Sequence, residues 1–133
     1  GSEQARLESL IVENDLKDHV ILEGSKTNPY PYMKYADLFV HPSYVESQGL
    51  TVLEAMALDV PCVVTKSLGP CEFIEDGVNG LLTEQSPESL AEKVLAILND
   101  KKLYQHIKEN TKCPEQFGPE RVMKQIEALI DAG

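Results

Sequence analysis

The sequence predicts an α/β fold, a Rossmann-like parallel sheet with helices on both faces. Short, wholly apolar runs alternate along the chain with segments in which apolar residues recur at helical spacing. Strands without polar alternation are typical of parallel sheets, because both faces of such a sheet are covered. The length of 133 residues suits one domain.

A helix, a strand and a second short helix are predicted at the start of the chain. Apolar residues recur at helical spacing within residues 3–13. The apolar run HVILE at residues 19–23 ends at Gly24, which predicts a strand. Pro31 favours the first turn of a helix, and we expect one over residues 31–36.

The middle of the chain is predicted to form a strand, a helix and another strand. The strands are residues 37–41 (DLFVH) and 61–65 (PCVVT), and the helix between them covers residues 49–58. That helix is apolar almost all round, so we expect it to be buried. Asp59 is expected to end it in the left-handed conformation, which Asp tolerates better than most residues.

The remainder of the chain is predicted to contain one more strand and three helices. Ser86 followed by Pro87 is typical of a helix start. The predicted elements are a loop or single helical turn at residues 70–77, a strand at 80–83, helices at 86–99 and 101–110, a loop at 114–118 and a helix at 119–131.

The charge of the chain excludes two classes of partner. The sequence carries 22 acidic and 12 basic residues, a net charge of −10. Nucleic acids and anionic membranes are bound through basic patches, so we expect neither as a partner of this domain. An anionic ligand can still bind locally through backbone N–H groups.

The cysteines and the hydropathy pattern indicate a reducing compartment. The chain has three cysteines and no C-x-x-C motif, which predicts neither a disulfide framework nor a zinc site. The chain holds no apolar run near the roughly 20 residues that span a bilayer, and no secretory signal opens it. We therefore expect a cytoplasmic protein.

The most informative stretch is the elbow between the strand at 37–41 and the helix at 49–58. Gly49 stands where the helix begins, so free backbone N–H groups and the helix dipole can meet an anion there. Glu46 in the elbow and Glu54 inside the apolar helix add two carboxylates, which accept hydrogen bonds from hydroxyl groups. A diphosphate with hydroxyl groups describes a sugar nucleotide.

The carboxyl ends of the other predicted strands are expected at the same edge of the sheet as the elbow. Right-handed crossovers place the carboxyl ends of parallel strands together, and ligands bind there. His41 and Lys66 lie at such ends, although a packed histidine and a solvated lysine remain the alternatives. Gly69 and Glu72 follow in the next loop, where Glu72 could equally stabilise a local helix dipole.

The motifs around the elbow resemble those of the donor-binding half of GT-B glycosyltransferases. The similarity is greatest to the large retaining group called glycosyltransferases group 1, which is family 4-like. The shared motifs are the E-x7-E pair Glu46 and Glu54, EAMA, the strand PCVVT, the Gly69-Pro70 loop and the run DGVNGLL at residues 76–82. Gln48, Asp59 and Leu68 depart from the usual family pattern.

The resemblance implies a role for each residue of the elbow. It implies that Glu54 holds the ribose hydroxyls and that Glu46, the candidate catalytic residue, contacts the transferred sugar. It also implies that the N–H groups of Gly49 and Leu50 face the diphosphate, and that Gly24 borders the base. The remaining donor-binding candidates are Ser47, Gln48 and Thr51, and capping of backbone groups is the alternative for Ser47 and Thr51.

The resemblance also implies what the chain lacks. It implies that residues 1–133 form a single partial nucleotide-sugar-binding domain, the C-terminal half of a GT-B fold without its first strand or strands. The acceptor-binding domain and the basic pair that neutralises the leaving diphosphate would lie upstream. Any membrane contact would come through that domain, and a peripheral location at the inner face of the membrane stays open for the longer protein.

The function implied is retaining transfer of a sugar from a nucleotide-diphosphate sugar, UDP-linked, to a glycan or lipid-linked acceptor. No cofactor and no metal are expected, since the chain has no D-x-D motif. We expect the chain to fold, to bind donor weakly or not at all, and not to catalyse transfer alone. The alternatives are a sugar-nucleotide epimerase of GT-B architecture and a non-catalytic α/β interaction domain.

Overall fold

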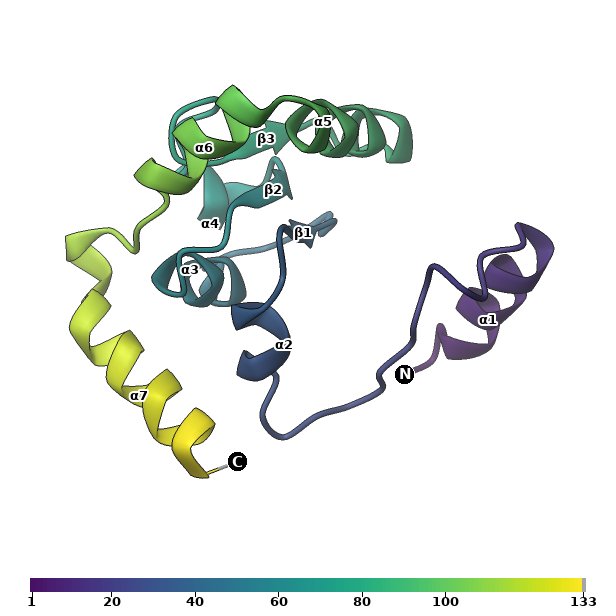
Figure 1. Cartoon of the computed structure of the whole chain (residues 1–133), viewed down its shortest axis with the longest axis horizontal. Helices are drawn as coiled ribbons and strands as arrows, with labels where there is room; N and C mark the ends of the chain where they lie inside the picture. Colours follow the sequence, from purple (N-terminus) through teal and green to yellow (C-terminus); the bar gives the residue numbers. More distant parts are fainter. Residues whose placement is uncertain (133) are drawn as a thin grey trace.

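A three-stranded parallel sheet forms the centre of the protein (Figure 1). The computed structural model describes residues 1–132, with side chains to Leu129. The strands are β1 (Phe39–His41), β2 (Cys62–Thr65) and β3 (Leu81–Thr83), in the order β1-β2-β3. Each crossover between consecutive strands contains a helix, as parallel pairing requires, which confirms the predicted fold class.

The helices lie on both faces of this sheet and beyond it. In chain order they are α1 (Gln4–Glu13), α2 (Tyr30–Lys34), α3 (Leu50–Ala57), α4 (Leu68–Cys71), α5 (Pro87–Asn99), α6 (Lys101–Asn110), the 3₁₀ helix η1 (Glu115–Phe117) and α7 (Pro119–Ala132). Apart from the region before α2, these bounds agree with the sequence predictions to within one to three residues at most ends.

The central strand β2 divides the core into two layers because its side chains alternate between the faces. Cys62 and Val64 point to the face covered by α3, where they pack with buried residues of that helix. Val63 points to the opposite face and packs against Ile97 of α5 and Ile107 of α6. All four residues of β2 are buried, as expected for a strand covered on both faces.

Helix α3 is the buried helix that the sequence predicts, except in its first turn, where Thr51 is exposed. Val52, Leu53, Ala55 and Met56 are buried, whereas Leu50 in the first turn is 59% exposed. The helix is followed by Asp59 at φ 60°, which confirms the predicted left-handed residue. Helix α7 packs alongside α3, and Val122 of α7 reaches the core on that side.

The strand predicted at residues 19–23 is wrong. These residues are irregular in the structure, and Val20, Ile21 and Leu22 are exposed. They belong to a long connection between α2 and α1, and α1 lies apart from the sheet at the right of Figure 1. An apolar run forms a strand only when another strand pairs with it, and within residues 1–132 β1 pairs only with β2.

Candidate functional site

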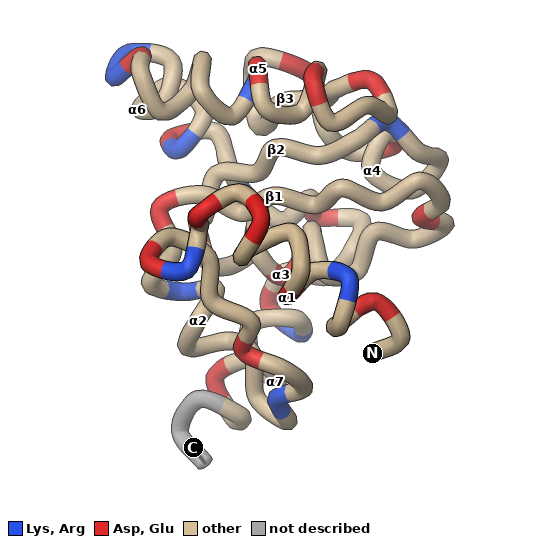
Figure 2. Tube along the Cα trace, turned by 90° about the vertical axis from the view of Figure 1, so that its right-hand side faces the viewer, with Lys and Arg blue, Asp and Glu red and all other residues tan. Residues whose placement is uncertain are grey.

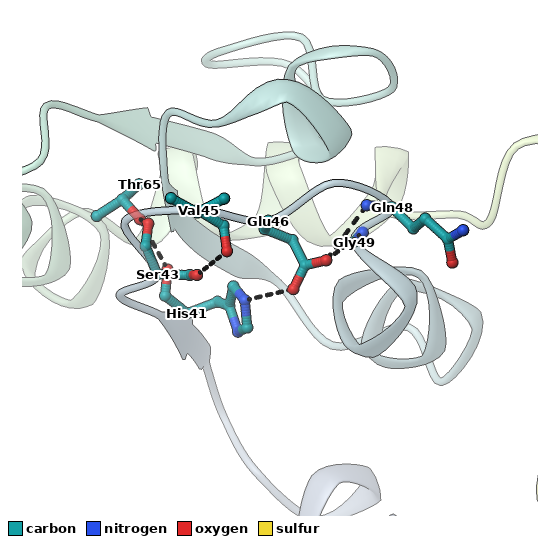
Figure 3. A network of polar contacts seen from close by, with 7 residues as sticks. All are labelled: His41, Ser43, Val45, Glu46, Gln48, Gly49 and Thr65. Atoms are coloured by element: carbon teal, nitrogen blue, oxygen red, sulfur yellow. Dashed lines mark hydrogen bonds and ion pairs between the residues drawn. The ribbon is translucent and has the colours of Figure 1, made fainter.

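The elbow between β1 and α3 is organised by the carboxylate of Glu46 (Figure 3). Its Oε1 accepts hydrogen bonds from the backbone N–H groups of Gly49, at 3.0 Å, and of Gln48, at 3.2 Å. These bonds hold the pKa of the Glu46 carboxyl below its usual value, with the neighbouring His41 ring as a smaller cause. The carboxylate is therefore ionised and fixed beside the start of α3.

His41 lies on the other side of this carboxylate. Its Nε2 is 3.5 Å from Glu46 Oε2, is buried, and makes no hydrogen bond within the described residues. The ring also stacks on that of Phe39, with 6.1 Å between centroids. His41 is therefore packed, which was one of the two alternatives that the sequence left open. Its Nε2 atom lies beside the Glu46 carboxylate.

Three donors from neighbouring segments hold the backbone of the elbow. The Thr65 hydroxyl, at the end of β2, donates to the carbonyl of Ser43 at 2.5 Å. The amide of Gln85, after β3, donates to the carbonyl of Tyr44 at 2.7 Å. The N–H of Gly69, in α4, donates to the carbonyl of Glu46 at 2.9 Å. The elbow is therefore built by the ends of all three strands.

Gly49 needs to be glycine for two reasons. Its backbone φ is +72°, a left-handed value that residues other than glycine rarely adopt. A Cβ at this position would also lie 2.9 Å from Cζ of Phe73. The residue is buried, and the first N–H groups of α3, which no helical carbonyl satisfies, follow it directly.

Glu54 lies one turn further along α3 and borders a cavity of about 530 Å³. The hydroxyl of Tyr30 donates to its Oε1 at 2.9 Å. Arg121 and Gln125 of α7 contribute polar groups to the opposite wall. The cavity is lined by Leu50, Leu53, Glu54, Gln116, Phe117, Gly118, Arg121, Val122 and Gln125. Its volume is within the range of small-molecule sites.

The structure brings most predicted site residues together but not all. Ser47, Gln48 and Thr51 are exposed around the N-terminus of α3. Gly24 instead lies in the exposed connection towards α1, where it borders a different pocket with Ile21. The cavity that Glu54 borders does not include Gly24, and the pocket that Gly24 borders does not include Glu54.

The outer candidates lie beside the elbow. Lys66 forms an ion pair with Glu84, which raises the pKa of the lysine. Glu72 is exposed at the end of α4, and both residues border a shallow pocket with Cys71. Gly69 contacts the elbow through its backbone. Their roles towards a donor stay predictions.

Sequence reasoning missed three residues of this site. Tyr30 is the first of them, and no pattern in the sequence connects it with Glu54, because 24 positions separate the two residues. Thr65 and Gln85 hold the elbow across similar separations. The position of Thr65 at the end of a predicted strand was the only signal available for any of them.

The distribution of charge, the arrangement of possible metal ligands and the length of the helices concern the partners considered from the sequence. Figure 2 shows Lys and Arg as scattered positions among more numerous Asp and Glu. Within residues 1–132, no group of three or more His, Cys, Asp or Glu side chains is arranged to hold a metal ion. None of the described helices is both long enough and apolar enough to span a membrane.

Comparison with known proteins gives consistent matches. The family model described as glycosyl transferases group 1 matches residues 1–113. N-acetyl-alpha-D-glucosaminyl L-malate synthase of Bacillus anthracis is 31% identical over 132 residues, covering 97% of this chain and 35% of the relative. The chain spans about a third of the length of such curated relatives.

Solved structures match the fold over almost the whole chain. Anabaena HepE in complex with UDP has a TM-score of 0.79 and 27% identity, covering 99% of this chain and 38% of that one. The same protein in complex with UDP-glucose has the same TM-score. The C-terminal domain of the group 1 protein LpcC from Francisella tularensis has a TM-score of 0.72 and 30% identity, covering 83% of this chain and 58% of that chain.

Proposed function

Because the chain belongs to the glycosyl transferases group 1 family, we propose that it forms the donor-binding site of a retaining glycosyltransferase. The fold likeness to HepE confirms the predicted fold class, the C-terminal half of a GT-B fold. One observation carries the proposal: Leu50, the first residue of α3, lines the same cavity as Glu54, and the carboxylate of Glu46 is fixed by the N–H of Gly49, the residue just before Leu50.

The proposed donor is a nucleotide-diphosphate sugar that lies along the first turns of α3. Its diphosphate meets the N–H groups at the helix start, where the dipole favours negative charge. Glu54 is four residues beyond Leu50, a rise of about 6 Å, so it can accept from the ribose hydroxyls while the diphosphate stays at the N-terminus. Glu46 lies at the sugar end of the proposed donor, where its carboxylate accepts from a hydroxyl of the transferred sugar.

In the proposed reaction the nucleoside diphosphate leaves and the sugar keeps its anomeric configuration. The helix N-terminus stabilises the developing charge on the diphosphate, without a metal ion. We propose UDP as the nucleotide, which is supported by the UDP and UDP-glucose complexes of HepE. The proposed acceptor is a glycan or a lipid-linked glycan.

The isolated chain is proposed to bind donor weakly and not to catalyse transfer. An acceptor-binding half and the cations that neutralise the leaving diphosphate would come from outside these residues. The match to the group 1 family favours transfer over the epimerase and the interaction-domain alternatives. Transfer of a radiolabelled sugar by the isolated chain, above background, would overturn the proposal of inactivity.

Saturation-transfer NMR with a panel of UDP-, GDP- and ADP-sugars tests the donor site. We expect binding of the UDP-sugars in the millimolar range, and a loss of about tenfold in affinity for Glu54→Gln, because the ribose loses a charged acceptor. Glu92→Gln, which changes an exposed carboxylate on α5, is the matched control and should leave affinity unchanged. Equal affinity of wild type and Glu54→Gln would contradict the ribose role.

A further inference from the structure

A tyrosine outside the elbow reaches the carboxylate at the cavity. Tyr30, the first residue of α2, donates its hydroxyl to Oε1 of Glu54 at 2.9 Å. Both side chains are partly buried, and Tyr30 does not itself line the cavity that Glu54 borders. The hydroxyl therefore approaches the carboxylate from outside the cavity.

The backbone of Tyr30 is held in turn by Asn28. The N–H of Tyr30 donates to Oδ1 of Asn28 at 3.3 Å, and Nδ2 of Asn28 donates to the carbonyl of Leu129 at 2.5 Å. Leu129 belongs to α7, which also forms the opposite wall of the cavity. The hydrogen bonds thus run from α7 through Asn28 and Tyr30 to Glu54.

We propose that Tyr30 is a positioning residue that orients Glu54 to bind the two ribose hydroxyls of a nucleotide. The inference deepens the proposed function and rests on it. A glutamate beside an open cavity has several rotamers, and ordering it on binding costs affinity. A fixed donor to Oε1 selects one rotamer beforehand and leaves Oε2, together with a lone pair of Oε1, for the ligand.

The chemistry of the tyrosine suits this role. Burial and the hydrogen bond to Glu54 raise the pKa of the Tyr30 hydroxyl, so it stays a donor at neutral pH. In a competing role, the tyrosine hydroxyl would occupy the position of a ribose hydroxyl and would have to be displaced by the ligand. Removing the hydroxyl would then strengthen nucleotide binding, whereas the positioning role predicts weaker binding. Tyr30→Phe deletes a single oxygen and separates the two roles by the sign of the change in affinity.

The test compares UDP with its 2′,3′-dideoxy analogue, which lacks both ribose hydroxyls, by saturation-transfer NMR on the full chain. We expect Tyr30→Phe to weaken UDP binding about fivefold to tenfold and to leave binding of the analogue unchanged. The double variant Tyr30→Phe/Glu54→Gln should lose no more than Glu54→Gln alone, because the tyrosine acts through the glutamate. Tyr35→Phe is the matched control, since that residue is 81% exposed directly after α2.

Three outcomes would overturn the inference. They are unchanged or tighter UDP binding by Tyr30→Phe, equal weakening for UDP and the analogue, and additive losses in the double variant. Failure of the proposed function would be seen in the wild-type protein, which would then bind neither UDP nor the analogue, or would bind both equally. In that case the inference would fail together with the proposed function. Circular dichroism of each variant shows whether the fold is kept.

Discussion

The backbone of Gly69 lies directly against that of Gln48. A Cβ on Gly69 would stand 2.7 Å from the carbonyl carbon of Gln48 and 2.9 Å from the nitrogen of Gly49. The N–H of Gly69 also donates to the carbonyl of Glu46. Helix α4 and the elbow are therefore in contact through backbone alone, and the position requires glycine because of this close approach.

Gly69→Ala should destabilise the protein by about 1–3 kcal/mol, the usual cost of forcing an extra methyl into a packed site. The new methyl group pushes against backbone atoms, which cannot move aside as a side chain could. Urea unfolding followed by circular dichroism measures the difference. Gly77→Ala is the comparison, because that Cβ meets nothing within 4 Å and the cost there comes from its φ of +81° alone.

Gly49→Ala should lose stability through two separable causes. The left-handed φ of +72° costs about 1–2 kcal/mol for alanine, and contact with the Phe73 ring adds to it. The double variant Gly49→Ala/Phe73→Leu should be less destabilised than the sum of the two single variants, because leucine removes the ring atoms that the new methyl would contact. Strict additivity in a double-mutant cycle would show that the ring contact is absent in solution.

Glu46→Gln should remove part of the dependence of stability on pH in the acid range. The pKa of Glu46 is lowered from 4.5 in the folded chain, chiefly by the N–H groups of Gly49 and Gln48. A carboxyl with a lowered folded pKa stabilises the fold above its unfolded pKa and loses this contribution as the pH falls through the folded value.

The difference in free energy of unfolding between wild type and Glu46→Gln should therefore be largest above about pH 5 and shrink below pH 4. Urea unfolding at a series of pH values measures it. Ser47→Ala changes the neighbouring residue without removing a titratable group and serves as the control. A difference that stays constant from pH 6 to pH 3 would contradict the hydrogen bonds assigned to Glu46.

The three cysteines should differ sharply in reactivity. Burial raises the pKa of the Cys62 thiol to about 12 and also raises that of Cys113, whereas Cys71 is exposed. Since the thiolate is the reactive form, a disulfide reagent at pH 8 should modify Cys71 quickly and the other two only after unfolding. Cys71→Ser should show no fast reaction, and a second fast thiol in the native protein would contradict the buried positions.

Most of the fold could be predicted because it depends on local patterns. The strands at β1, β2 and β3 are apolar runs between turn residues, and the later helices carry clear periodicity and caps, such as Ser86, whose side chain accepts from the N–H of Ser89. The run at residues 19–23 has the same apolar pattern. It is not a strand, because pairing depends on a neighbour that the pattern does not reveal.

The candidate site could be predicted only in part. Glu46, Gly49 and Glu54 stand in one segment, so their spacing around a helix start was visible in the sequence. Tyr30 and Gln85 reach the site from distant segments, and Gly24 lies away from it. Side-chain contacts of this kind depend on how the elements pack.

Local sequence patterns are sufficient to predict the α/β class, the buried helix α3 and the elbow with its two carboxylates, because periodicity, turn residues and short spacings are properties of a local segment. Three contacts became visible only in the folded chain: Glu46 accepts from N–H groups of its own elbow, His41 lies beside Glu46, and the hydroxyl of Tyr30 donates to Glu54. The contact of Glu46 depends on how the elbow folds, whereas those of His41 and Tyr30 also depend on how the sheet and helices pack.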